Sequence, residues 1–306
     1  MPGNDSKVVV VGNCTVDLSF SVPSLPRPGE TVLASERSMD LGGKGANQAV
    51  VASRFGVRTL LAVPIGRDSE GDWASTQLAA EALGLEALLR SDAPTDQSVI
   101  WVASDGENSI VSTHRAARSA DPAWAEAVLH RHGLKGDVLL MQGNLSVETT
   151  RAALSVGRGA GMMTMLNPAP IQAGYAGLLP LVDVAIFNRV EAETFGGYAD
   201  PRQAGAAICD GGVPHVIVTL GAEGAILIDR EGIAHLPAPR VTAIDTVGAG
   251  DTLGGALAAA LARGASFSRA AAMAVEAASI TVTRKGTQKS FPTRAEARAL
   301  CEKYGC

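Results

Sequence analysis

The sequence predicts an α/β fold: a three-layer sandwich in which helices cover both faces of a mainly parallel central sheet, with a small β flap beside it. Three observations support this prediction. Short apolar strands alternate with helices from residue 137 to residue 220, an order typical of parallel sheets. A β-branched run at residues 7–12 predicts a buried first strand. Residues 98–113 predict a hairpin inserted into the series.

The composition agrees with this class. Apolar residues make up 46% of the chain and aromatic residues 4%, with 34 glycines among 306 residues, so the core must be built from Ala, Val, Leu and Ile between tight turns. We expect a single domain over residues 1–306 that buries roughly three quarters of its unfolded surface. The net charge of −5, without a long run of either sign, argues against nucleic acid or a membrane as partner.

Targeting and metal-binding signals do not stand out in the chain. The longest apolar runs are too short to span a bilayer and the N-terminus has no signal-peptide core, so we expect a cytoplasmic protein. The cysteines show neither C-x-x-C spacing nor a nearby histidine pattern for zinc, and we expect them to be reduced. They are Cys14, Cys209, Cys301 and Cys306.

The segment after the first strand is a candidate ligand site. In open α/β sheets, ligands collect beyond the carboxyl ends of the strands, so Thr15 and Asp17 in the predicted loop at residues 13–17 are candidate contacts. Asp17 could equally be a turn residue. Three prolines between residues 20 and 30 end regular structure, and residues 31–34 predict a strand that leaves the main sheet.

A glycine-rich helix start follows, G-G-K-G-A-N-Q-A-V at Gly42–Val50. Backbone N–H groups and the positive end of a helix that closes near Phe55 would face outward there. Asn47, one turn into this helix, could hydrogen-bond a ligand hydroxyl. Helix packing alone could also require the glycines.

The later elements are predicted from the same periodicities. They are strand 59–63, helix 70–83, hairpin strands 98–103 and 109–113, strand 137–141, helix 147–158, strands 162–166 and 183–187, helices 191–195 and 201–210, strand 215–220 and helix 256–263. A long Ala-rich helix then ends in the polar loop at residues 282–290, which could be solvent-facing only.

The strongest candidate for a catalytic site is the segment at residues 244–255, I-D-T-V-G-A-G-D-T-L-G-G. Gly248, Ala249 and Gly250 carry little or no side chain, so their N–H groups at a helix N-terminus could hold anionic oxygen. Asp251 beside them could take a proton from a hydroxyl while these groups stabilise a transferring phosphoryl group. The alternative is an N-capping aspartate in a glycine-rich turn.

Two further strand ends carry polar groups. Asn188 and Glu191 stand three apart at a helix start, where they could reach a hydrated Mg²⁺ and phosphate oxygens or form a capping box. The strand that ends near Thr219 leads into the glycine-rich turn 221–224, a weak motif by itself. No Walker A loop, dinucleotide fingerprint or protein-kinase motif set occurs, so any nucleotide must be bound by another route.

Together these segments resemble the ribokinase family of sugar kinases over almost the whole chain. Six motifs occur in the family's order: G-G-K-G-A-N-Q from Gly42, N-P-A-P at Asn167–Pro170, N-x-x-E at Asn188–Glu191, T-L-G at Thr219–Gly221, D-T-x-G-A-G-D at Asp245–Asp251 and V-T-R-K-G at Val282–Gly286. The resemblance implies a ribokinase-like fold with a small β lid. It also implies an ATP-dependent kinase that transfers the γ-phosphate to a primary hydroxyl of a sugar.

The resemblance implies residue roles at the sugar. Asp251 would deprotonate the sugar hydroxyl, and Gly248, Ala249 and Gly250 would form the anion hole. The residues implied for the sugar site are Asp17, Thr15, Gly43, Lys44, Asn47, Asn144 and Asp251. The lid would consist of segments 14–41 and 97–116 and would pair with the lid of a second subunit, which implies a homodimer.

Cofactor sites are implied in the same way. ATP and its phosphates would be bound by Asn188, Glu191, Thr219, Gly221 and Gly224, with Glu191 reaching Mg²⁺ through water. A monovalent cation, K⁺, would sit beside the anion hole. Its implied ligands are the side chains of Asp245 and Ser290 and the carbonyl groups of Val247, Thr281, Arg284 and Gly286.

Departures from the family pattern concern the sugar. Thr15 stands where the family has Asn, and Asn144 stands where it has a sugar-contacting Glu. The lid around Arg115–Arg118 lacks G-A-N, and Leu253-Gly254 replaces Phe-Asn. Such changes alter which hydroxyls can be paired, and an unpaired buried polar group costs about 1–3 kcal/mol. D-ribose, giving ribose 5-phosphate, is the leading prediction; another pentose, a ketose, a sugar acid or a nucleoside stays open.

Two functions of other classes are alternatives. A catalytically silent sugar- or nucleotide-binding regulator on the same fold would have no need of a base such as Asp251. A nicotinamide-dependent oxidoreductase is disfavoured, because no dinucleotide fingerprint follows the first strand.

Overall fold

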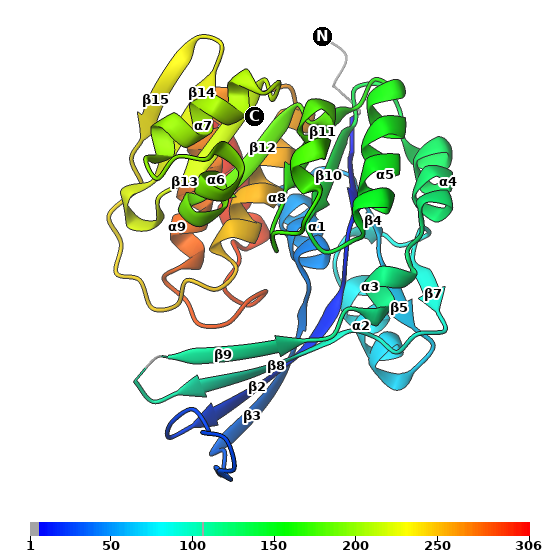
Figure 1. The fold of residues 1–306 in the computed structure, drawn as a ribbon, viewed down its shortest axis with the longest axis vertical. Coiled ribbons are helices and arrows are strands. Elements are labelled where there is room, and N and C mark those ends of the chain that lie inside the picture. Colours follow the sequence, from blue (N-terminus) through cyan, green and yellow to red (C-terminus); the bar gives the residue numbers. More distant parts are fainter. Residues whose placement is uncertain (1–5, 106) are drawn as a thin grey trace.

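The structure, a computed structural model, describes residues 6–105 and 107–306. Its centre is a nine-stranded sheet with the order β15-β14-β13-β12-β11-β10-β1-β4-β6 (Figure 1). The strands are β15 (Gly232–Leu236), β14 (Ala225–Asp229), β13 (His215–Thr219), β12 (Val184–Asn188), β11 (Met163–Asn167), β10 (Val138–Gln142), β1 (Val8–Val11), β4 (Thr59–Ala62) and β6 (Leu83–Gly84). From β13 to β6 neighbouring strands are parallel, and β14 and β15 add an antiparallel edge. The predicted mainly parallel sheet is confirmed.

Helices cover both faces of this sheet, which confirms the predicted three-layer sandwich. Within β1, Val8 and Val10 belong to one core cluster and Val9 and Val11 to the other, as the two-residue period of a strand requires. The helices that contribute to the first cluster are α1 (Lys44–Arg54), α2 (Ser69–Ala79), α8 (Ala249–Ala262), α9 (Phe267–Thr281) and α10 (Arg294–Tyr304). The long helices that contribute to the second are α4 (Pro122–His132), α5 (Val147–Gly159), α6 (Arg189–Gly196) and α7 (Pro201–Asp210).

A second, four-stranded sheet projects from the main body, at the bottom of Figure 1. Its order is β3 (Glu36–Gly42), β2 (Thr15–Val22), β8 (Gln97–Ala103), β9 (Asn108–Ser112). The predicted hairpin β8–β9 is confirmed. Apart from Gly42 at the end of β3, the four strands lie in the two segments expected for the lid. Only residues 12–14 separate β1 from β2, so this sheet starts at the carboxyl ends of the central strands.

Smaller elements complete the fold. β5 (Pro64–Gly66) and β7 (Leu89–Ser91) form a two-stranded sheet. A short helix and two 3-10 turns lie in connections: α3 (Arg115–Ser119), η1 (Tyr175–Leu181) and η2 (Gly221–Glu223). Within the described residues, none of the helices combines the length and the apolar character that a membrane span needs.

Some predicted boundaries in the N-terminal third are wrong. The loop predicted at residues 13–17 ends before Thr15, where β2 begins. Residues 31–34 form no strand. The strand of this region is β3, which begins at Glu36 and pairs residue by residue with β2, from Thr15 opposite Gly42 to Ser21 opposite Glu36. Such pairing is a tertiary effect that local propensity does not contain.

Later boundaries also differ. The helix predicted at residues 70–83 ends at Ala79, because Leu83 and Gly84 form the edge strand β6. The helix predicted at residues 256–263 begins earlier, at Ala249, so the glycine-rich stretch itself is helical. The antiparallel hairpin β14–β15 and the helix α10 were not predicted.

Candidate active site

Asp251 lies in the first turn of α8. This helix begins after Gly248, whose φ of +80° is left-handed and where a Cβ would lie 2.7 Å from the ring of Phe291, so glycine suits this turn. Ala249, Gly250 and Asp251 are its first three residues, and the backbone N–H groups at such a start lack intrahelical carbonyl partners. The residues predicted for the anion hole therefore stand at a helix N-terminus.

Both carboxylate oxygens of Asp251 accept hydrogen bonds from α1. Asn47 donates from Nδ2 to Oδ2 over 2.9 Å, and Gln48 donates from Nε2 to Oδ1 over 3.1 Å. Lys44 Nζ stands 3.8 Å from Oδ1. The N-cap alternative is wrong, because Gly248 occupies the N-cap position of α8 and the carboxylate of Asp251 is directed toward α1.

The glycine-rich start of α1 packs against the segment that follows β1. A Cβ on Gly43 or on Gly45 would lie 2.7 Å from a backbone atom of that segment. The packing alternative therefore explains both glycines. It does not explain Lys44 and Asn47, whose polar ends meet Asp251.

Asp17 is a strand residue of β2, so the turn alternative is wrong. Its Oδ1 accepts a hydrogen bond from Thr15 Oγ1 over 2.7 Å. Burial raises the pKa of Asp17; hydrogen bonds from Thr15 and Ser98 oppose this rise, and the carboxylates of Asp40 and Asp251 add to it. A desolvated carboxylate thus stands where the second sheet joins the main body, within electrostatic reach of Asp251.

Asn144 follows β10, the strand next to β1. Its Oδ1 is buried, and no described residue donates a hydrogen bond to it. Buried polar atoms in native proteins nearly always have a partner. This side chain therefore has an acceptor available for a donor from outside the chain.

Asn188 and Glu191 form the capping box of α6, as the structural alternative predicts. Glu191 N donates to Asn188 Oδ1 and Asn188 N donates to Glu191 Oε2, both over 2.8 Å. Asn188 lies beside Thr219 in the pairing of β12 with β13. Burial raises the pKa of Glu191, and the charge of Lys44 opposes this rise. The positive charge of Lys44 therefore lies near the carboxylates of both Glu191 and Asp251. Contact of Asn188 and Glu191 with a ligand stays a prediction.

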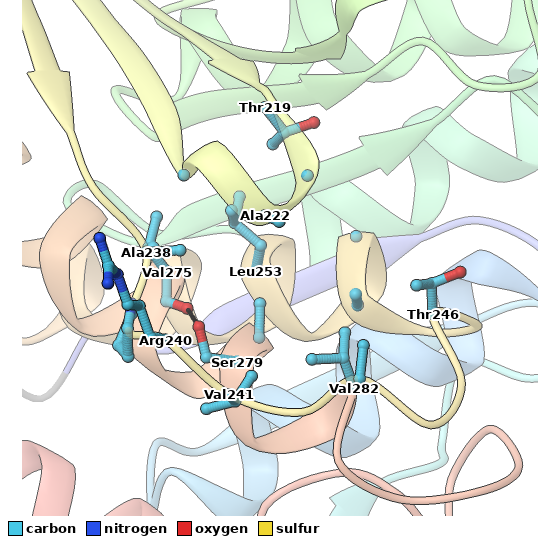
Figure 2. Close-up of a pocket in the computed structure, with 17 residues that line it drawn as sticks. Thr219, Ala222, Ala238, Arg240, Val241, Thr246, Leu253, Val275, Ser279 and Val282 are labelled. Carbon is cyan, nitrogen blue, oxygen red and sulfur yellow. Dashed lines mark hydrogen bonds between the residues drawn. The ribbon is translucent and has the colours of Figure 1, made fainter.

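A pocket of about 370 Å³ adjoins the start of α8 (Figure 2). Three residues predicted for the nucleotide, Thr219, Gly221 and Gly224, line it together with Ala249 and Gly250. Its apolar wall consists of Ala222, Ala238, Pro239, Val241, Ala243, Leu253, Val275, Ala278 and Val282. A largely apolar pocket that reaches a helix N-terminus can hold a flat base at one end and an anion at the other.

Asp245 ties the loop before α8 to the loop after α9. Its Oδ1 accepts from the backbone N–H of Val247 and its Oδ2 from that of Gly286, each over 3.0 Å. Residues 282–290 are mostly half-buried or buried, so the alternative of a loop that only faces solvent is wrong. The structure thus brings together three of the residues predicted around the monovalent cation.

The other predicted cation ligands lie in or next to the same loop. Ser290 is buried and donates from Oγ to the carbonyl of Thr287 over 2.6 Å, and the carbonyl of Thr281 accepts the N–H of Arg284 over 3.1 Å. Their role at a cation stays a prediction. In the described part of the chain, no cluster of three or more His, Cys, Asp or Glu side chains is suited to a metal ion.

Three glutamines around Asp251 were missed as site residues. Gln48 contacts Asp251 directly, Gln142 donates from Nε2 to Gln48 Oε1 over 2.8 Å, and Gln288 donates from Nε2 to Asn47 Oδ1 over 3.0 Å. The place of Gln48 in G-G-K-G-A-N-Q was a usable signal. The other two carry none, because only the fold brings β10 and the C-terminal loop to α1.

Comparison with known proteins identifies the family. The model described as pfkB family carbohydrate kinase matches residues 5–294. The chain belongs to this family. Membership of the pfkB family confirms the resemblance based on the six motifs, and it removes the support for a nicotinamide-dependent oxidoreductase.

Relatives and solved structures in this comparison cover nearly the whole chain. A ribokinase of Haemophilus influenzae is 35% identical over 305 residues, 96% of this chain and 98% of that protein. A deoxyribokinase of Salmonella typhi is 31% identical over 298 residues, 94% of this chain and 95% of that protein. A ribokinase structure from Thermotoga maritima matches with a TM-score of 0.89 at 30% identity and covers 97% and 99% of the two chains. Ribokinase of Arabidopsis thaliana, solved with ribose and ATP, matches with a TM-score of 0.84 at 27% identity over 96% and 98%.

Proposed function

We propose that this pfkB-family kinase transfers the γ-phosphate of ATP to the primary hydroxyl of D-ribose, giving ribose 5-phosphate and ADP. The observation that carries the proposal is the position of Asp251. Its carboxylate is buried and held by Asn47 and Gln48, at the helix start where the pocket with Gly250 opens. The similarity to a ribokinase from Haemophilus influenzae supports ribose as the sugar.

The proposed chemistry is an in-line phosphoryl transfer. Asp251 takes the proton of the sugar hydroxyl as the hydroxyl oxygen bonds to the γ-phosphorus and the bond to the bridging oxygen of ADP breaks. The backbone N–H groups of Gly248, Ala249 and Gly250 stabilise the charge of the transferring group. Lys44, 3.8 Å from Asp251 Oδ1, adds a positive charge on the same side.

ATP occupies the pocket that Thr219, Gly221 and Gly224 line. Asn188 and Glu191 fit a hydrated Mg²⁺ beside the phosphates, because amide and carboxylate oxygens are hard ligands that this ion accepts, often through water. Mg²⁺ neutralises phosphate charge when it is bound. The pairing of Asn188 with Thr219 in neighbouring strands supports this arrangement.

The sugar lies between the start of α1 and the base of the second sheet, next to Asp251. Its hydroxyl groups form hydrogen bonds with Asp17, Asn47 and the backbone at Gly43. The unpaired acceptor of Asn144 takes one further hydroxyl, and Thr15 holds Asp17 in place. The similarity to a deoxyribokinase makes 2-deoxyribose the rival substrate.

A monovalent cation and a second subunit complete the proposal. K⁺ binds at the loops that Asp245 joins, with Ser290 and the carbonyl groups of Val247, Thr281, Arg284 and Gly286 as its further ligands. The second sheet acts as a lid and pairs with that of another subunit in a homodimer. The exposed apolar side chains of its hairpin, Val102, Ile110 and Val111, support this pairing, which sedimentation analysis tests. The expected cytoplasmic location stays a prediction.

The deciding experiment is an ADP-release assay with MgATP and K⁺ over a panel of pentoses, 2-deoxyribose, hexoses, sugar acids and nucleosides. Ribose should give the highest kcat/KM. Asp251→Asn should then lower kcat by about 10²- to 10⁴-fold, the contribution of a general base. Asp121→Asn, at the exposed N-cap of α4, is the matched control and should retain full activity.

Three other outcomes have clear meanings. Another preferred sugar would show that Thr15 and Asn144 mark a changed specificity. Unchanged turnover in Asp251→Asn would refute the catalytic assignment. No turnover with any compound would favour the silent regulator.

A further inference from the structure

Two buried glutamines stand in series behind Asp251. Gln48 Nε2 donates to Asp251 Oδ1 over 3.1 Å, and Gln142 Nε2 donates to Gln48 Oε1 over 2.8 Å. Gln48 is 0% exposed and Gln142 is 1% exposed. Gln142 is the last residue of β10, so the series links the central sheet to α8 through α1.

The direction of the two amides follows from the chemistry of a carboxylate. An ionised carboxylate only accepts hydrogen bonds, so the NH₂ group of Gln48 must face Asp251. The carbonyl oxygen of Gln48 then faces the opposite way, where Gln142 donates to it. Because the terminal torsion of a glutamine amide is broad, this donor from Gln142 is what holds the NH₂ group of Gln48 toward Asp251.

The buried position of Gln142 is energetically unfavourable for its side-chain oxygen. Its Oε1 is buried without a hydrogen-bond partner among the described residues, and an unpaired buried acceptor is unfavourable. A Cβ on Gly12 would lie 2.1 Å from this oxygen, so position 12 must be glycine for Gln142 to fit. The sequence therefore keeps a polar side chain where an apolar one of similar length would fill the space.

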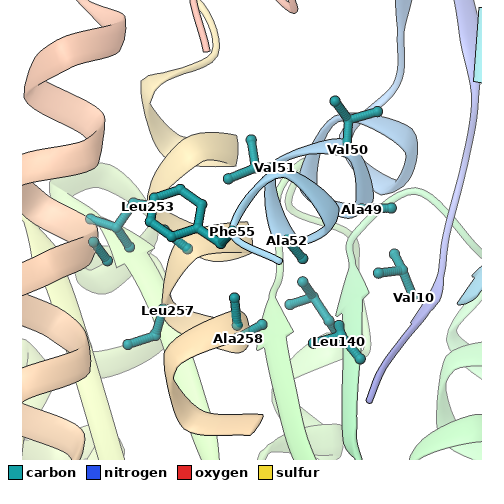
Figure 3. Close-up of a cluster of buried hydrophobic side chains, with 14 of the residues drawn as sticks. Val10, Ala49, Val50, Val51, Ala52, Phe55, Leu140, Leu253, Leu257 and Ala258 are labelled. Carbon is teal, nitrogen blue, oxygen red and sulfur yellow. The ribbon is translucent and has the colours of Figure 1, made fainter. Parts of the chain in front are cut away.

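Gln48 is likewise a polar side chain among mostly apolar neighbours. Away from the polar groups at Asp251, the contact of α1 with α8 is apolar: Val51 of α1 and Phe55, the residue after it ends, lie near Leu253 and Leu257 of α8 (Figure 3). A Cβ on Gly254 would lie 3.3 Å from the side-chain amide of Gln48. The small residue on α8 leaves room for the amide to reach Asp251.

We propose that Gln142 and Gln48 are positioning residues, which orient the carboxylate of Asp251 through a relay of two amides. The proposal rests on the proposed function, in which Asp251 is the base. The plane of the carboxylate is set on one side by Asn47 at Oδ2 and on the other by Gln48 at Oδ1. Loss of the relay leaves Asn47 as the one amide donor to Asp251 and allows the carboxylate to turn away from the hydroxyl.

The test compares Gln142→Met, Gln48→Met and the double variant by initial rates and thermal unfolding. Gln142→Met should lower kcat about tenfold, leave the KM for ATP within about twofold and leave the melting temperature unchanged or higher, because the unpaired oxygen is gone. Gln48→Met should lower kcat further. The double variant should match Gln48→Met, since groups acting in series are not additive. Gln77→Met, on the exposed face of α2, is the control and should retain kcat.

A second variant gives a readout that a purely structural role would not move. Gln48→Glu places a carboxylate against that of Asp251, and like charges at this distance compete for one proton. The acid limb of the pH profile of kcat/KM should move to higher pH by about one unit or more. An unmoved profile would overturn the proposal.

The rate measurements can fail in two distinguishable ways. Full kcat in Gln142→Met, or additive losses in the double variant, would also overturn the relay while Asp251→Asn still shows its expected loss of kcat. Full activity of Asp251→Asn would instead refute the proposed function on which the relay rests.

Discussion

Gln288 Nε2 donates a hydrogen bond to Asn47 Oδ1 over 3.0 Å, although 241 positions separate the two residues. Asn47 in turn donates from Nδ2 to Asp251 Oδ2 over 2.9 Å. The loop after α9 is therefore one side chain away from the proposed base. A change in the position of this loop can therefore alter the hydrogen bonds of the Asp251 carboxylate without any contact to the substrates.

This connection underlies a prediction about monovalent cations. K⁺ should raise the rate more than Na⁺ at equal ionic strength, because the loops that Asp245 joins order Gln288 and the start of α8. Asp245→Asn removes the negative charge and should abolish the difference between the two salts. Initial rates in KCl and NaCl, with melting temperatures in the same salts, measure it. Equal rates and equal melting temperatures for the unchanged protein would contradict a cation site.

Two glycines of α8 form a matched pair for substitution. Outside its own helix, no heavy atom of the described residues lies within 4 Å of a Cβ placed on Gly250, whereas a Cβ on Gly255 would lie 2.4 Å from the carbonyl oxygen of Gln48. Gly250→Ala should keep or slightly raise stability, since Ala is the better helix former by up to about 1 kcal/mol. It should lower kcat/KM for ATP at least roughly tenfold, because its methyl group would occupy space at the proposed anion hole. Gly255→Ala should cost about 1–3 kcal/mol of unfolding free energy by separating α1 from α8.

Urea unfolding and initial rates of the two glycine variants separate these effects. A Gly250→Ala variant with unchanged ATP kinetics would argue against an anion hole at this helix start. A fully stable Gly255→Ala variant would show that α1 and α8 adjust to the added methyl group.

The ionised carboxylate of Asp17 should lower the stability of the protein at neutral pH and strengthen the binding of the sugar. Burial raises its pKa, so the folded state holds the proton more tightly than the unfolded state, and stability falls as the pH rises through that raised pKa. Asp17→Asn should therefore be more stable than the unchanged protein at neutral pH, with a difference that shrinks toward pH 4. Its KM for the sugar should rise about tenfold to a hundredfold, because a charged hydrogen bond is lost.

Asp68 is the matched control with the opposite sign. Burial works against the shift, but hydrogen bonds from Thr95 and Gly71 lower the pKa of Asp68. Asp68→Asn should therefore reduce stability at neutral pH and leave the KM for the sugar unchanged. Thermal unfolding from pH 4 to pH 8 measures both variants, and a destabilised Asp17→Asn would contradict the sign of the argument.

Glu296 links the same C-terminal loop to α10. Arg284 forms a bidentate ion pair with Glu296. This pair is the main cause that lowers the pKa of Glu296 from 4.5 to about 2; burial opposes the lowering, and hydrogen bonds from Thr293 add to it. The stability from this pair is complete above pH 4.5 and is lost as the pH falls from 4.5 to about 2. Because one third of each side chain is exposed, solvent screening limits the loss in Glu296→Gln at pH 7 to about 1 kcal/mol.

Urea midpoints between pH 7 and pH 3 measure this loss, which should shrink steadily below pH 4.5. Glu302→Gln, an exposed residue of the same helix, should show no such trend. A loss in Glu296→Gln that is constant with pH would exclude the ion pair as its source.

The sequence predicted secondary structure and site residues best where the hydrophobic periodicity and the residue types within a few positions indicated the same element. The β-branched run of β1, the helix α7 and the glycines before Asp251 each carry a signal within a few residues. The boundaries that failed depended on pairing. Leu83 by its local pattern belongs to the preceding helix, yet Leu83 and Gly84 form an edge strand because β4 offers an open edge.

The sequence by itself determined the α/β class, the two glycine-rich helix starts and the identity of the base candidate, because helix periodicity and backbone access at glycine are local properties. Only the tertiary structure decided that Asp251 is held by Asn47 and Gln48 and is not an N-cap. It alone brought Gln142 and Gln288 to the site. Hydrogen-bond partners from distant segments are chosen by how the helices pack on the sheet, and no spacing along the chain records that choice.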